Sequence, residues 1–364
     1  MYTQRRIPIS MPPDHLDTYL ARGWYRMGQM IFTCQFLGYK AAYFSTIWIR
    51  LDLNLHKNSK SQRKLLRRNG EQFRHVIQPA ILDAEKEALF QRYRLHFDGY
   101  LSPTLKHSMQ GNTDHNIYNT YEISIYDGER LIAYSFFDLG QKAIASIKAV
   151  YDPDYGKHSL GYYTMLLEME YAKAHNFDFY YPGYVVPGYS KFDYKTRIGK
   201  VDYYENKSRK WLPFSDFTED QIPVRILKSK LTDMSGLLTL FKIDHTEIMY
   251  PLYEANMMGY WEEHFFEHPL SMICFPKRMH YLFFTITYDL KKDKFVLYEC
   301  MQSKELSLNY SEEQTKQYVD NGVNLVLDLL VKKEIILETD SMMEVAEYLL
   351  PFKDEILYDD DIPF

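Results

Sequence analysis

The segment SLGYYTMLLEME (159–170) places small and polar residues at the start of an expected helix. Ser159 is a favourable N-cap, and the next three residues, Leu160, Gly161 and Tyr162, would leave backbone N–H groups without acceptors inside the helix. Because Gly161 has no side chain, another backbone or a phosphate can approach it closely. Such a helix start can bind the phosphates of a cofactor or an RNA terminus, or stabilise negative charge developing on a carbonyl oxygen. An ordinary capped core helix has the same pattern.

A second candidate is the basic run between Lys57 and His75, which contains a single acidic residue, Glu71. Its cations are Lys57, Lys60, Arg63, Lys64, Arg67, Arg68 and Arg74. This density suits contacts with phosphates, which position a nucleic acid without reading its sequence. The apolar stripe is thin, so a basic helix here would bury little and its charge indicates a partner. A solvated surface is the alternative interpretation.

The segment YYPGYVVPGYSKFDYK (180–195) leaves an expected strand through two glycines and two prolines. It presents tyrosines and lysines in alternation: Tyr181, Tyr184, Tyr189, Lys191, Tyr194 and Lys195. Aromatic faces interleaved with cations suit stacking on a terminal base and pairing with phosphate. A structured loop that packs its tyrosines on a sheet is the alternative, and spacing alone does not decide.

Histidine and cysteine patterns predict no metal site. His264 to His268 fits the H-x-x-E-H pattern of a zinc peptidase subclass, which needs a continuing helix to place both histidines on one face. Pro269 follows immediately and ends such a helix. The acidic context indicates a helix end instead. The three cysteines are far apart in sequence and give neither a disulfide framework nor a CxxC spacing: Cys34, Cys274 and Cys300.

In the first half of the chain, the residue pattern changes from helical periodicity to segments typical of strands. Helical periodicity covers Ser59 to Asn69 and Asp83 to Phe97. After these helices we expect, in order, a strand at 118–126, a strand at 130–138 after the Asp127-Gly128 turn, a strand at 143–151, a helix from Ser159 to about His175, and a strand at 177–185. This order is that of the GNAT acyltransferase core. We therefore predict an α+β fold with a mixed, largely antiparallel sheet flanked by helices.

A chain of 364 residues exceeds what one core usually supports, so two domains are expected. Two prolines and several turn-forming residues place the boundary near 213–223, which gives domains 1–215 and 216–364. In the second we expect helices at 246–266, 311–333 and 341–350, a hairpin at 280–302, a strand at 335–339 and a frayed acidic tail at 357–364. These elements predict a C-terminal α+β satellite domain.

Charge divides the chain at the same place. Residues 1–215 carry 29 Lys/Arg and 21 Asp/Glu, a net charge of +8, whereas residues 216–364 carry 14 and 28, a net charge of −14. A basic half suits an anionic partner, although two domains with different surfaces would show the same asymmetry. The N-terminus has no apolar signal segment, and no run of 18 uncharged apolar residues occurs. We therefore predict a cytoplasmic protein without a membrane partner.

Several of these segments, in the same order, resemble motifs of the arginyl-tRNA–protein transferase family, which includes bacterial leucyltransferases that modify proteins starting with Asp or Glu. The segment YLARGWYRMGQMIFTC (19–34) resembles the family's N-terminal motif, around Gly23, Trp24, Arg26 and Gly28. The basic run SKSQRKLLRRN (59–69) is similar to its basic signature, and LFQRYRLHFDG (89–99) to its Tyr-x-x-Tyr region.

The resemblance continues to about residue 213. The stretch 151–184 is similar to the family's central motif and keeps Asp152, Pro153, Ser159, Leu160 and Gly161. KFDYK (191–195) matches its Lys-x-x-Tyr-Lys ending, and Trp211 stands where the family has a closing tryptophan.

Several positions depart from the family pattern. The N-terminal cysteine cluster is reduced to Cys34, with Leu37 and Lys40 where further cysteines are expected, so no metal or iron–sulfur role carries over. The tyrosine of the third strand is replaced by Lys148, and TRIGKVDYYE follows KFDYK in place of a proline-containing stretch. Residues 216–364 match nothing in the family.

The resemblance implies transfer of an amino acid, Arg or Leu, from aminoacyl-tRNA to the N-terminal amine of an acceptor protein, with no cofactor besides the charged tRNA. It implies that the helix start at Ser159, Leu160 and Gly161 binds the carbonyl oxygen or terminal phosphate. Binding of the tRNA and donor is assigned to Arg63, Lys64, Arg67, Arg68, Tyr184, Lys191, Tyr194 and Lys195. The candidates for the base that deprotonates the attacking ammonium are Glu122, Asp152 and His158.

Two alternatives share these residues. An acyl-CoA-dependent GNAT enzyme acting on a small amine would use the same helix start but has no need for the basic run. A non-catalytic descendant that binds tRNA or protein would explain the lost cysteines and Lys148. Bound tRNA or bound CoA in the purified protein would separate these hypotheses.

Overall fold

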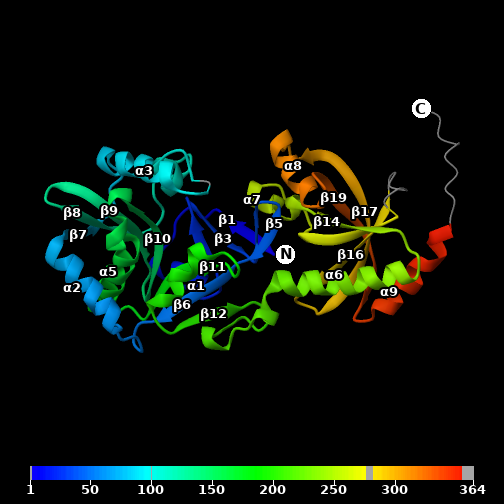
Figure 1. Cartoon of the computed structure of the whole chain (residues 1–364), viewed down its shortest axis with the longest axis horizontal. Coiled ribbons are helices and arrows are strands. Elements are labelled where there is room, and N and C mark those ends of the chain that lie inside the picture. Colours follow the sequence, from blue (N-terminus) through cyan, green and yellow to red (C-terminus); the bar gives the residue numbers. More distant parts are fainter. Residues whose placement is uncertain (1, 100, 276–281, 355–364) are drawn as a thin grey trace. The chain divides into compact units, whose positions relative to one another are not determined.

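The computed structural model describes residues 2–99, 101–275 and 282–354, which form two compact units (Figure 1). The eight-stranded unit comprises Arg5–Thr33 and Thr46–Phe217. The six-stranded unit comprises Met1–Gln4, Cys34–Ser45 and Thr218–Phe364. The chain passes from one unit to the other within β1 (Thr3–Arg6) and at the end of β3 (Met30–Cys34). The boundary expected near 213–223 separates two continuous domains, whereas each unit here is built from separate segments of the chain.

The sheet of the eight-stranded unit has the order β13-β12-β6-β11-β10-β9-β8-β7. Its strands are β6 (Ile47–Asp52), β7 (Arg74–Pro79), β8 (Thr120–Asp127), β9 (Arg130–Leu139), β10 (Ala143–Tyr151), β11 (Phe179–Val185), β12 (Val201–Glu205) and β13 (Lys210–Pro213). Neighbouring strands are antiparallel except β10 and β11, which are parallel. This is a mixed, largely antiparallel sheet, and the predicted hairpin, third strand and returning strand are confirmed.

Helices cover both faces of this sheet (Figure 1). On one face, α2 (Lys60–Gln72) and α5 (Leu160–Ala174) pack over a core that includes Ile123, Ile144 and Leu166. On the other, α3 (Ala84–His96) and α4 (Leu105–Gln110) pack against Tyr134 and Phe136. The unit also holds α1 (Pro13–Leu20), the hairpin of β2 (Tyr25–Met27) with β3, and the 3-10 segments η1 (Pro153–His158), η2 (Ser190–Ile198) and η3 (Phe214–Asp216).

Local signals place two of these helices correctly. Ser59 caps α2 in a complete capping box: its side chain accepts from the Gln62 N–H, and the Gln62 side chain accepts from the Ser59 N–H. Asp83 caps α3 by accepting from the Lys86 N–H at 2.8 Å. The predicted helices over Ser59–Asn69 and Asp83–Phe97 are therefore confirmed, because each begins at a residue whose side chain replaces a missing helical acceptor.

The six-stranded unit is built on a sheet of order β18-β14-β15-β16-β17-β19. Its strands are β14 (His245–Met249), β15 (Leu270–Cys274), β16 (Phe283–Asp289), β17 (Lys294–Ser307), β18 (Asn324–Leu325) and β19 (Asp328–Thr339), and it also contains the β4 (Phe36–Tyr39) and β5 (Ala42–Ser45) hairpin. Its helical segments are η4 (Glu219–Gln221), α6 (Pro223–Leu240), η5 (Pro251–Glu254), α7 (Ala255–Met258), α8 (Glu312–Asp320), α9 (Met342–Leu349) and η7 (Leu350–Asp354). The predicted α+β character is confirmed. No helix among the described residues is long and apolar enough to span a membrane.

Two helices predicted in this unit are wrong. The helix at 246–266 is replaced by β14 and short turns, because Pro251 and Gly259, with φ +97, interrupt any long helix. The helix at 311–333 stops at Asp320, where Gly322 adopts φ +68, and the β-branched residues beyond it pair with β17. The hairpin at 280–302 is confirmed from Phe283 onward, whereas residues 280–281 and the tail at 357–364 lie outside the described residues.

Candidate active site

The two parallel strands of the eight-stranded unit separate part-way along their length. β10 and β11 pair only over Ala143–Ala145 and Phe179–Tyr181. Beyond that point β10 stays paired with β9, and its extra residue Ile147 forms a bulge, while β11 stays paired with β6. Strands that diverge in this way expose backbone groups that no neighbouring strand satisfies, and bulges are common beside active sites. We call this opening the split, and its closed end the vertex.

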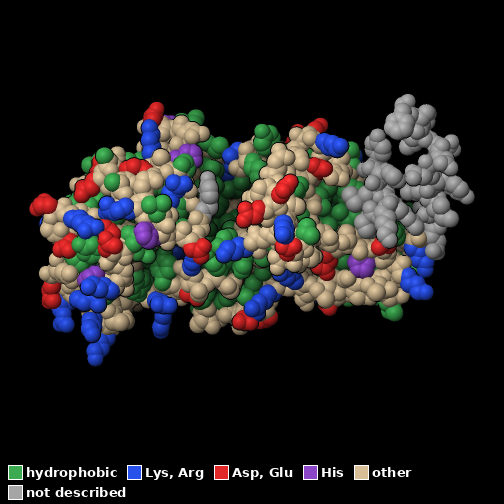
Figure 2. Space-filling model, turned by 45° about the horizontal axis from the view of Figure 1, so that its top comes forward, with side chains coloured by type: hydrophobic (Ala, Val, Ile, Leu, Met, Phe, Trp, Pro, Cys, Tyr) green, Lys and Arg blue, Asp and Glu red, His purple; other side chains and the backbone are tan. Residues whose placement is uncertain are grey.

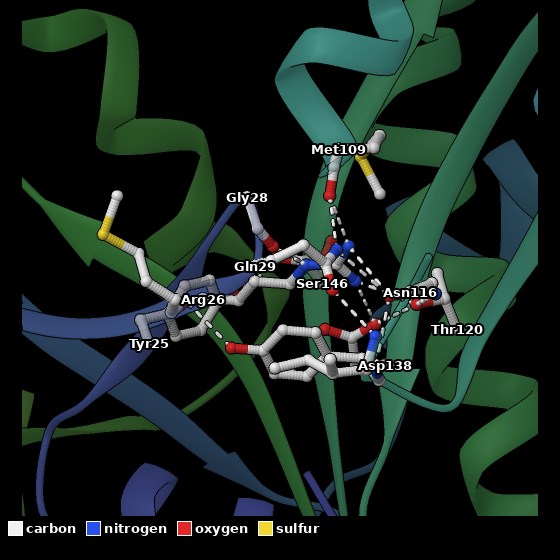
Figure 3. Close-up of polar contacts among 12 residues, drawn as sticks. Tyr25, Arg26, Gly28, Gln29, Met109, Asn116, Thr120, Asp138 and Ser146 are labelled. Atoms are coloured by element: carbon white, nitrogen blue, oxygen red, sulfur yellow. Dashed lines mark hydrogen bonds and ion pairs between the residues drawn. The ribbon is translucent and has the colours of Figure 1, made fainter. Parts of the chain in front are cut away.

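Tyr25 of β2 lies at the vertex (Figure 3). Its hydroxyl is within hydrogen-bond reach of the Ser146 carbonyl on β10 and lies 2.8 Å from the Tyr181 carbonyl on β11, so it can donate to either strand. Burial raises the pKa of Tyr25 well above its usual value, which keeps the hydroxyl protonated. One side chain from a distant hairpin therefore holds both strands at the point where their own pairing ends.

Lysine and tyrosine side chains from η2 and β11 meet at the split. The Lys195 Nζ donates to the Tyr184 carbonyl at 3.2 Å and lies over the rings of Tyr184 and Phe192. Gly183, with φ +91, makes room for it, because a Cβ there would stand 3.2 Å from Lys195 Nζ. Burial lowers the pKa of Lys195 to about 8. A lysine with this pKa gives up its proton more readily than a lysine at the surface, so a larger fraction of it is the neutral amine near neutral pH.

Glu168 of α5 is a buried carboxyl group beside the vertex. Its side chain is fully buried, accepts from the Tyr180 hydroxyl at 2.6 Å, and leaves Oε1 without a recorded partner among the described residues. Burial raises the pKa of Glu168 to about 7, although the hydroxyls of Tyr180, Ser135 and Ser146 act in the opposite direction. Glu168 and Tyr194 both raise the pKa of Tyr25 electrostatically, so both side chains lie near Tyr25.

Replacing Glu168 with Gln is expected to stabilise the protein increasingly as the pH rises from 5 to 8. A pKa raised in the folded state means that the folded protein holds a proton that the unfolded chain releases, so the wild type loses stability from its ordinary pKa of 4.5 up to about 7. The difference between variant and wild type should grow by about 2 kcal/mol over this interval. Urea denaturation at both pH values measures it.

The matched control is Glu170→Gln, two residues along α5. The pKa of Glu170 is lowered by its bonds with Asn58 and Lys173, so this variant should lose stability relative to the wild type in neutral buffer. A Glu168→Gln difference that does not change with pH would contradict the assignment of a raised pKa.

Arg26 follows Tyr25 on β2 and joins four parts of the unit (Figure 3). Its guanidinium and Nε donate at 2.7–3.3 Å to the Gly28 carbonyl, the Thr120 hydroxyl, the Asp138 carboxylate, the Met109 carbonyl and the Asn116 amide oxygen. The Arg26–Asp138 ion pair is buried, with side chains 1% and 0% exposed. An adjoining cavity of about 480 Å³ has Arg26 in its wall. Because an arginine has five N–H donors and all five have acceptors, Arg26 holds the fold rather than offering charge to a ligand.

The start of α5 differs in detail from its prediction. Ser159 has φ +53 and its side chain makes no capping bond, so the predicted side-chain cap is wrong. The reason is that η1 runs directly into α5 and uses Ser159 as a left-handed turn between them. Leu160 is buried in the core, whereas Gly161 is part-exposed. Since α5 begins at Leu160, its first N–H groups have no acceptors inside the helix.

Two of the predicted bases are held in ion pairs. Glu122 of β8 is fully buried, lies 3.1 Å from Lys86 and accepts from the Ile81 N–H. Asp152 is buried between Arg92 and Arg130, at 3.0 and 2.6 Å. These contacts argue against either carboxylate as the base. His158 packs edge-on against Phe73, and partial burial, Lys157 and Arg68 lower its pKa, so it is uncharged at neutral pH.

The predicted RNA-binding residues of α2 are exposed on its outer face. Arg63, Lys64, Arg67 and Arg68 all face solvent, and Figure 2 shows Lys and Arg side chains gathered at that end of the eight-stranded unit. Within the described part of the chain, no ion pair is recorded for these four cations. Lys191, in contrast, is bound by Asp98 at 2.7 Å, which ties η2 to the end of α3.

The H-x-x-E-H pattern forms no metal site among the described residues, where no cluster of three or more potential ligands occurs. Its residues lie in a turn between α7 and β15, so the predicted helix end is wrong as well. His268 is buried among the rings of Tyr2, Phe266 and Tyr298, and burial lowers its pKa well below the usual value.

Residues 85–205, which contain the split, α5 and η2, match the family described as arginine-tRNA-protein transferase, C terminus. Over this segment, about a third of the chain, the protein is similar to the arginyl-tRNA–protein transferase family. It is 24% identical over 217 residues to the aspartate/glutamate leucyltransferase of Leptospira interrogans serovar copenhageni, covering 58% of this chain and 82% of that one. It is 25% identical over 207 residues to the enzyme of that name from Xylella fastidiosa, covering 54% and 78%.

Two solved structures are more distant. The C-terminal domain of a putative lysylphosphatidylglycerol synthetase from Agrobacterium fabrum aligns with a TM-score of 0.36 at 11% identity, over 46% of this chain and 58% of that one. FemX aligns with a TM-score of 0.32 at 10% identity, over 52% and 65%. Scores at this level do not assign a fold.

The segment predicted to resemble the family's N-terminal motif, around Gly23, Trp24, Arg26 and Gly28, builds the hairpin that reaches the vertex. Gly28 turns the β2–β3 hairpin with φ +61. Gly23 adopts φ +73 directly under the Tyr204 ring, where a Cβ would come within 2.8 Å. Trp24 packs near Tyr19, and Trp211 donates to the Ala21 carbonyl at 2.8 Å. Residues far apart in sequence therefore fix the approach of Tyr25.

Sequence reasoning missed Tyr25 and Glu168. Tyr25 lies inside a quoted motif and was one tyrosine among 33, so composition gave no reason to select it. Glu168 lies on a helix whose apolar residues surround it, and a charged residue within such a run is a signal that could have been used. Lys148 was noted only as a departure; burial lowers its pKa to about 8, and its Nζ lies 5.6 Å from the centre of the Phe90 ring.

Proposed function

We propose that this protein transfers an amino acid, Arg or Leu, from aminoacyl-tRNA to the N-terminal amine of an acceptor protein. The single observation that carries the proposal is the family match over residues 85–205, because those residues contain both the split and the helix start beside it. The similarity to aspartate/glutamate leucyltransferases supports the same reaction class. Charged tRNA is the co-substrate, and the proposal uses no further cofactor.

The donor is proposed to enter the split as in a GNAT-like acyltransferase core. Support comes from a strand with a bulge, a helix that follows it, and a returning parallel strand that diverges from the first. The aminoacyl end would lie between β10 and β11, against Tyr184, Tyr194 and Lys195. The N–H groups at the start of α5 would face the ester carbonyl or the terminal phosphate, where a helix N-terminus favours negative charge.

Phosphates closer to the body of the tRNA are proposed to bind the outer face of α2. Support comes from its four exposed cations and from Arg68, which lies close enough to His158 to lower its pKa. The end of the basic helix and the start of α5 are therefore neighbours. An extended RNA 3′ end could contact both at once, with the sequence-independent character that phosphate contacts have.

The reaction is aminolysis of an ester. The acceptor ammonium loses one proton, its nitrogen attacks the ester carbonyl, the C–O bond breaks, and the 3′ oxygen of the tRNA leaves as a hydroxyl once it has taken a proton. Because the ester is already activated, orientation and stabilisation of the oxyanion supply most of the rate. His158 is proposed as the base, since it is uncharged at neutral pH and stands next to α5, whereas Glu122 and Asp152 are ion-paired.

Transfer of radiolabelled amino acids from charged total tRNA tests the proposal directly. The full chain is incubated with peptides that start with Asp, Glu, Arg or Lys, and label on one peptide that ribonuclease abolishes establishes the reaction, the donor and the acceptor. No transfer by folded, tRNA-bound protein would favour the non-catalytic descendant. Bound CoA with no tRNA affinity would favour the acyl-CoA-dependent enzyme.

Substitution of Gly161 is expected to separate catalysis from folding. A Cβ at Gly161 would meet the Tyr151 ring at 3.6 Å, an ordinary contact, so Gly161→Ala should fold and gain about 0.5–1 kcal/mol from helix propensity. Gly161→Leu should fold as well but place a side chain over the N–H groups, lowering transfer by at least about 100-fold. Single-turnover transfer and thermal unfolding measure both effects, and full activity of the Leu variant would refute the oxyanion assignment.

A further inference from the structure

The basic helix α2 has a second, polar face that is buried. Gln62 is 3% exposed and Asn69 is 0% exposed. Seven residues correspond to about two turns, so both amides point to the same side of the helix. Buried amides of this kind are retained when they satisfy other polar groups. Their partners are backbone atoms of the candidate active site.

Asn69 holds the backbone at His158, two residues before the start of α5. Its Nδ2 donates to the His158 carbonyl at 2.9 Å, and its Oδ1 accepts from the Arg68 Nε at 3.2 Å. The carbonyl belongs to the peptide that leads into Ser159, whose φ of +53 sets the direction in which α5 begins. A serine in this conformation persists only when its surroundings hold it there. One side chain therefore connects an exposed arginine of α2 with the start of α5.

Gln62 holds the end of η2. Its Nε2 donates to the Ile198 carbonyl at 2.9 Å and the Arg197 carbonyl at 3.2 Å, and lies 3.0 Å from the Tyr162 hydroxyl. That hydroxyl donates to the Arg197 carbonyl at 2.8 Å, which closes the network. The Gln62 Oε1 accepts from the N–H of Ser59, the N-cap of α2, at 2.7 Å. η2 carries Tyr194 and Lys195, so this amide joins α2 to the other side of the split.

We propose that Gln62 and Asn69 are positioning residues through which docking of RNA on the outer face of α2 fixes both the start of α5 and η2. The inference rests on the proposed function and adds a route by which donor binding organises the site. η1 and η2 are 3-10 segments, which hold their shape less firmly than α-helices. The regular helix α2 supplies the rigidity that η1 and η2 lack, because Gln62 and Asn69 contact these two segments. The cations of α2 face outward.

Isosteric substitutions isolate the two amide donors. Asn69→Asp and Gln62→Glu keep the acceptor oxygens but replace the N–H₂ groups that bind the carbonyls. The matched control is Gln72→Glu, which adds the same charge to the exposed last residue of α2. Asn69→Ser and Gln62→Met remove the bonds without adding charge, and they replace any acidic variant that does not fold.

Two readouts test the coupling in the full chain with purified charged tRNA. The transfer rate at saturating tRNA should fall by about 100-fold in each variant, as expected for a misplaced reacting group, while the Kd for tRNA stays within about threefold of the control. Hydrogen exchange should show that tRNA protects the amides of residues 160–163 and 191–198 in the wild type and in the control, but not in the variants.

Each outcome has one meaning. Loss of transfer together with loss of tRNA-dependent protection, at unchanged Kd, supports the coupling. Transfer and protection equal to those of the control overturn it. A wild type that binds tRNA without transferring refutes the proposed function alone, because the exchange measurement still tests the coupling. A wild type that shows no tRNA-dependent protection overturns the coupling even if transfer occurs.

Discussion

Replacing Arg26 with Leu is expected to destabilise the eight-stranded unit by about 3–5 kcal/mol, the range for removal of one partner from a buried ion pair. The loss arises because Asp138 is fully buried and its Oδ2 has no hydrogen-bond partner among the residues that the structure describes, so without Arg26 an uncompensated carboxylate remains. The Gly28 carbonyl loses its Arg26 donor at the same time, and the Met109 carbonyl keeps only the bond from Gln29. Of the single substitutions considered, this one has the largest expected effect on folding.

Urea denaturation followed by tryptophan fluorescence measures this loss. The informative control is the double variant Arg26→Leu/Asp138→Leu, which removes both charges and should recover part of the stability, since an apolar pair avoids the desolvation of an unpaired charge. A single variant within about 1 kcal/mol of the wild type would contradict a structural role for Arg26. Equal destabilisation in the single and double variants would show that the carbonyl bonds, rather than the charge on Asp138, dominate.

Charge reversal on α2 is expected to have the largest effect on RNA binding. Lys64 and Arg67 are exposed on the outer face of α2, so Lys64→Glu/Arg67→Glu should leave the buried amides and the fold intact. Two phosphate contacts are replaced by two repulsions, which should weaken tRNA binding by about 100-fold at low salt. The slope of log Kd against log salt should also decrease by about 1.5, corresponding to two phosphates at 0.7–0.9 each.

Fluorescence anisotropy with labelled tRNA over a salt series gives both quantities. Lys228→Glu on α6 is the control, because Lys228 is equally exposed but belongs to the acidic six-stranded unit. Its affinity should stay within about twofold of the wild type, because the charge of α2 is unchanged. If Lys228→Glu loses as much affinity per reversed charge as the double variant, the net charge of the chain governs binding and the assignment of α2 is wrong.

The local part of the fold could be predicted from the sequence. Ser59 and Asp83 mark helix starts, and Asp127-Gly128 marks a hairpin, because each acts on atoms within a few residues. The helices predicted at 246–266 and 311–333 are wrong, because parts of both segments pair with strands of the six-stranded sheet. There, pairing with distant strands outweighed local propensity, and no feature within a short window reports such pairing.

For the candidate site, the sequence by itself determined the chemical inventory: a basic helix, a glycine at a helix start, and tyrosines and lysines after a strand. Only the tertiary structure decided which of these residues meet. Tyr25 contacts strands more than a hundred residues away in the sequence. Gln62 and Asn69 bind η2 and η1, whereas Glu122 and Asp152 form ion pairs. The physical reason is that hydrogen bonds and burial act through space, so a buried carboxylate or amide is defined by neighbours that sequence spacing does not reveal.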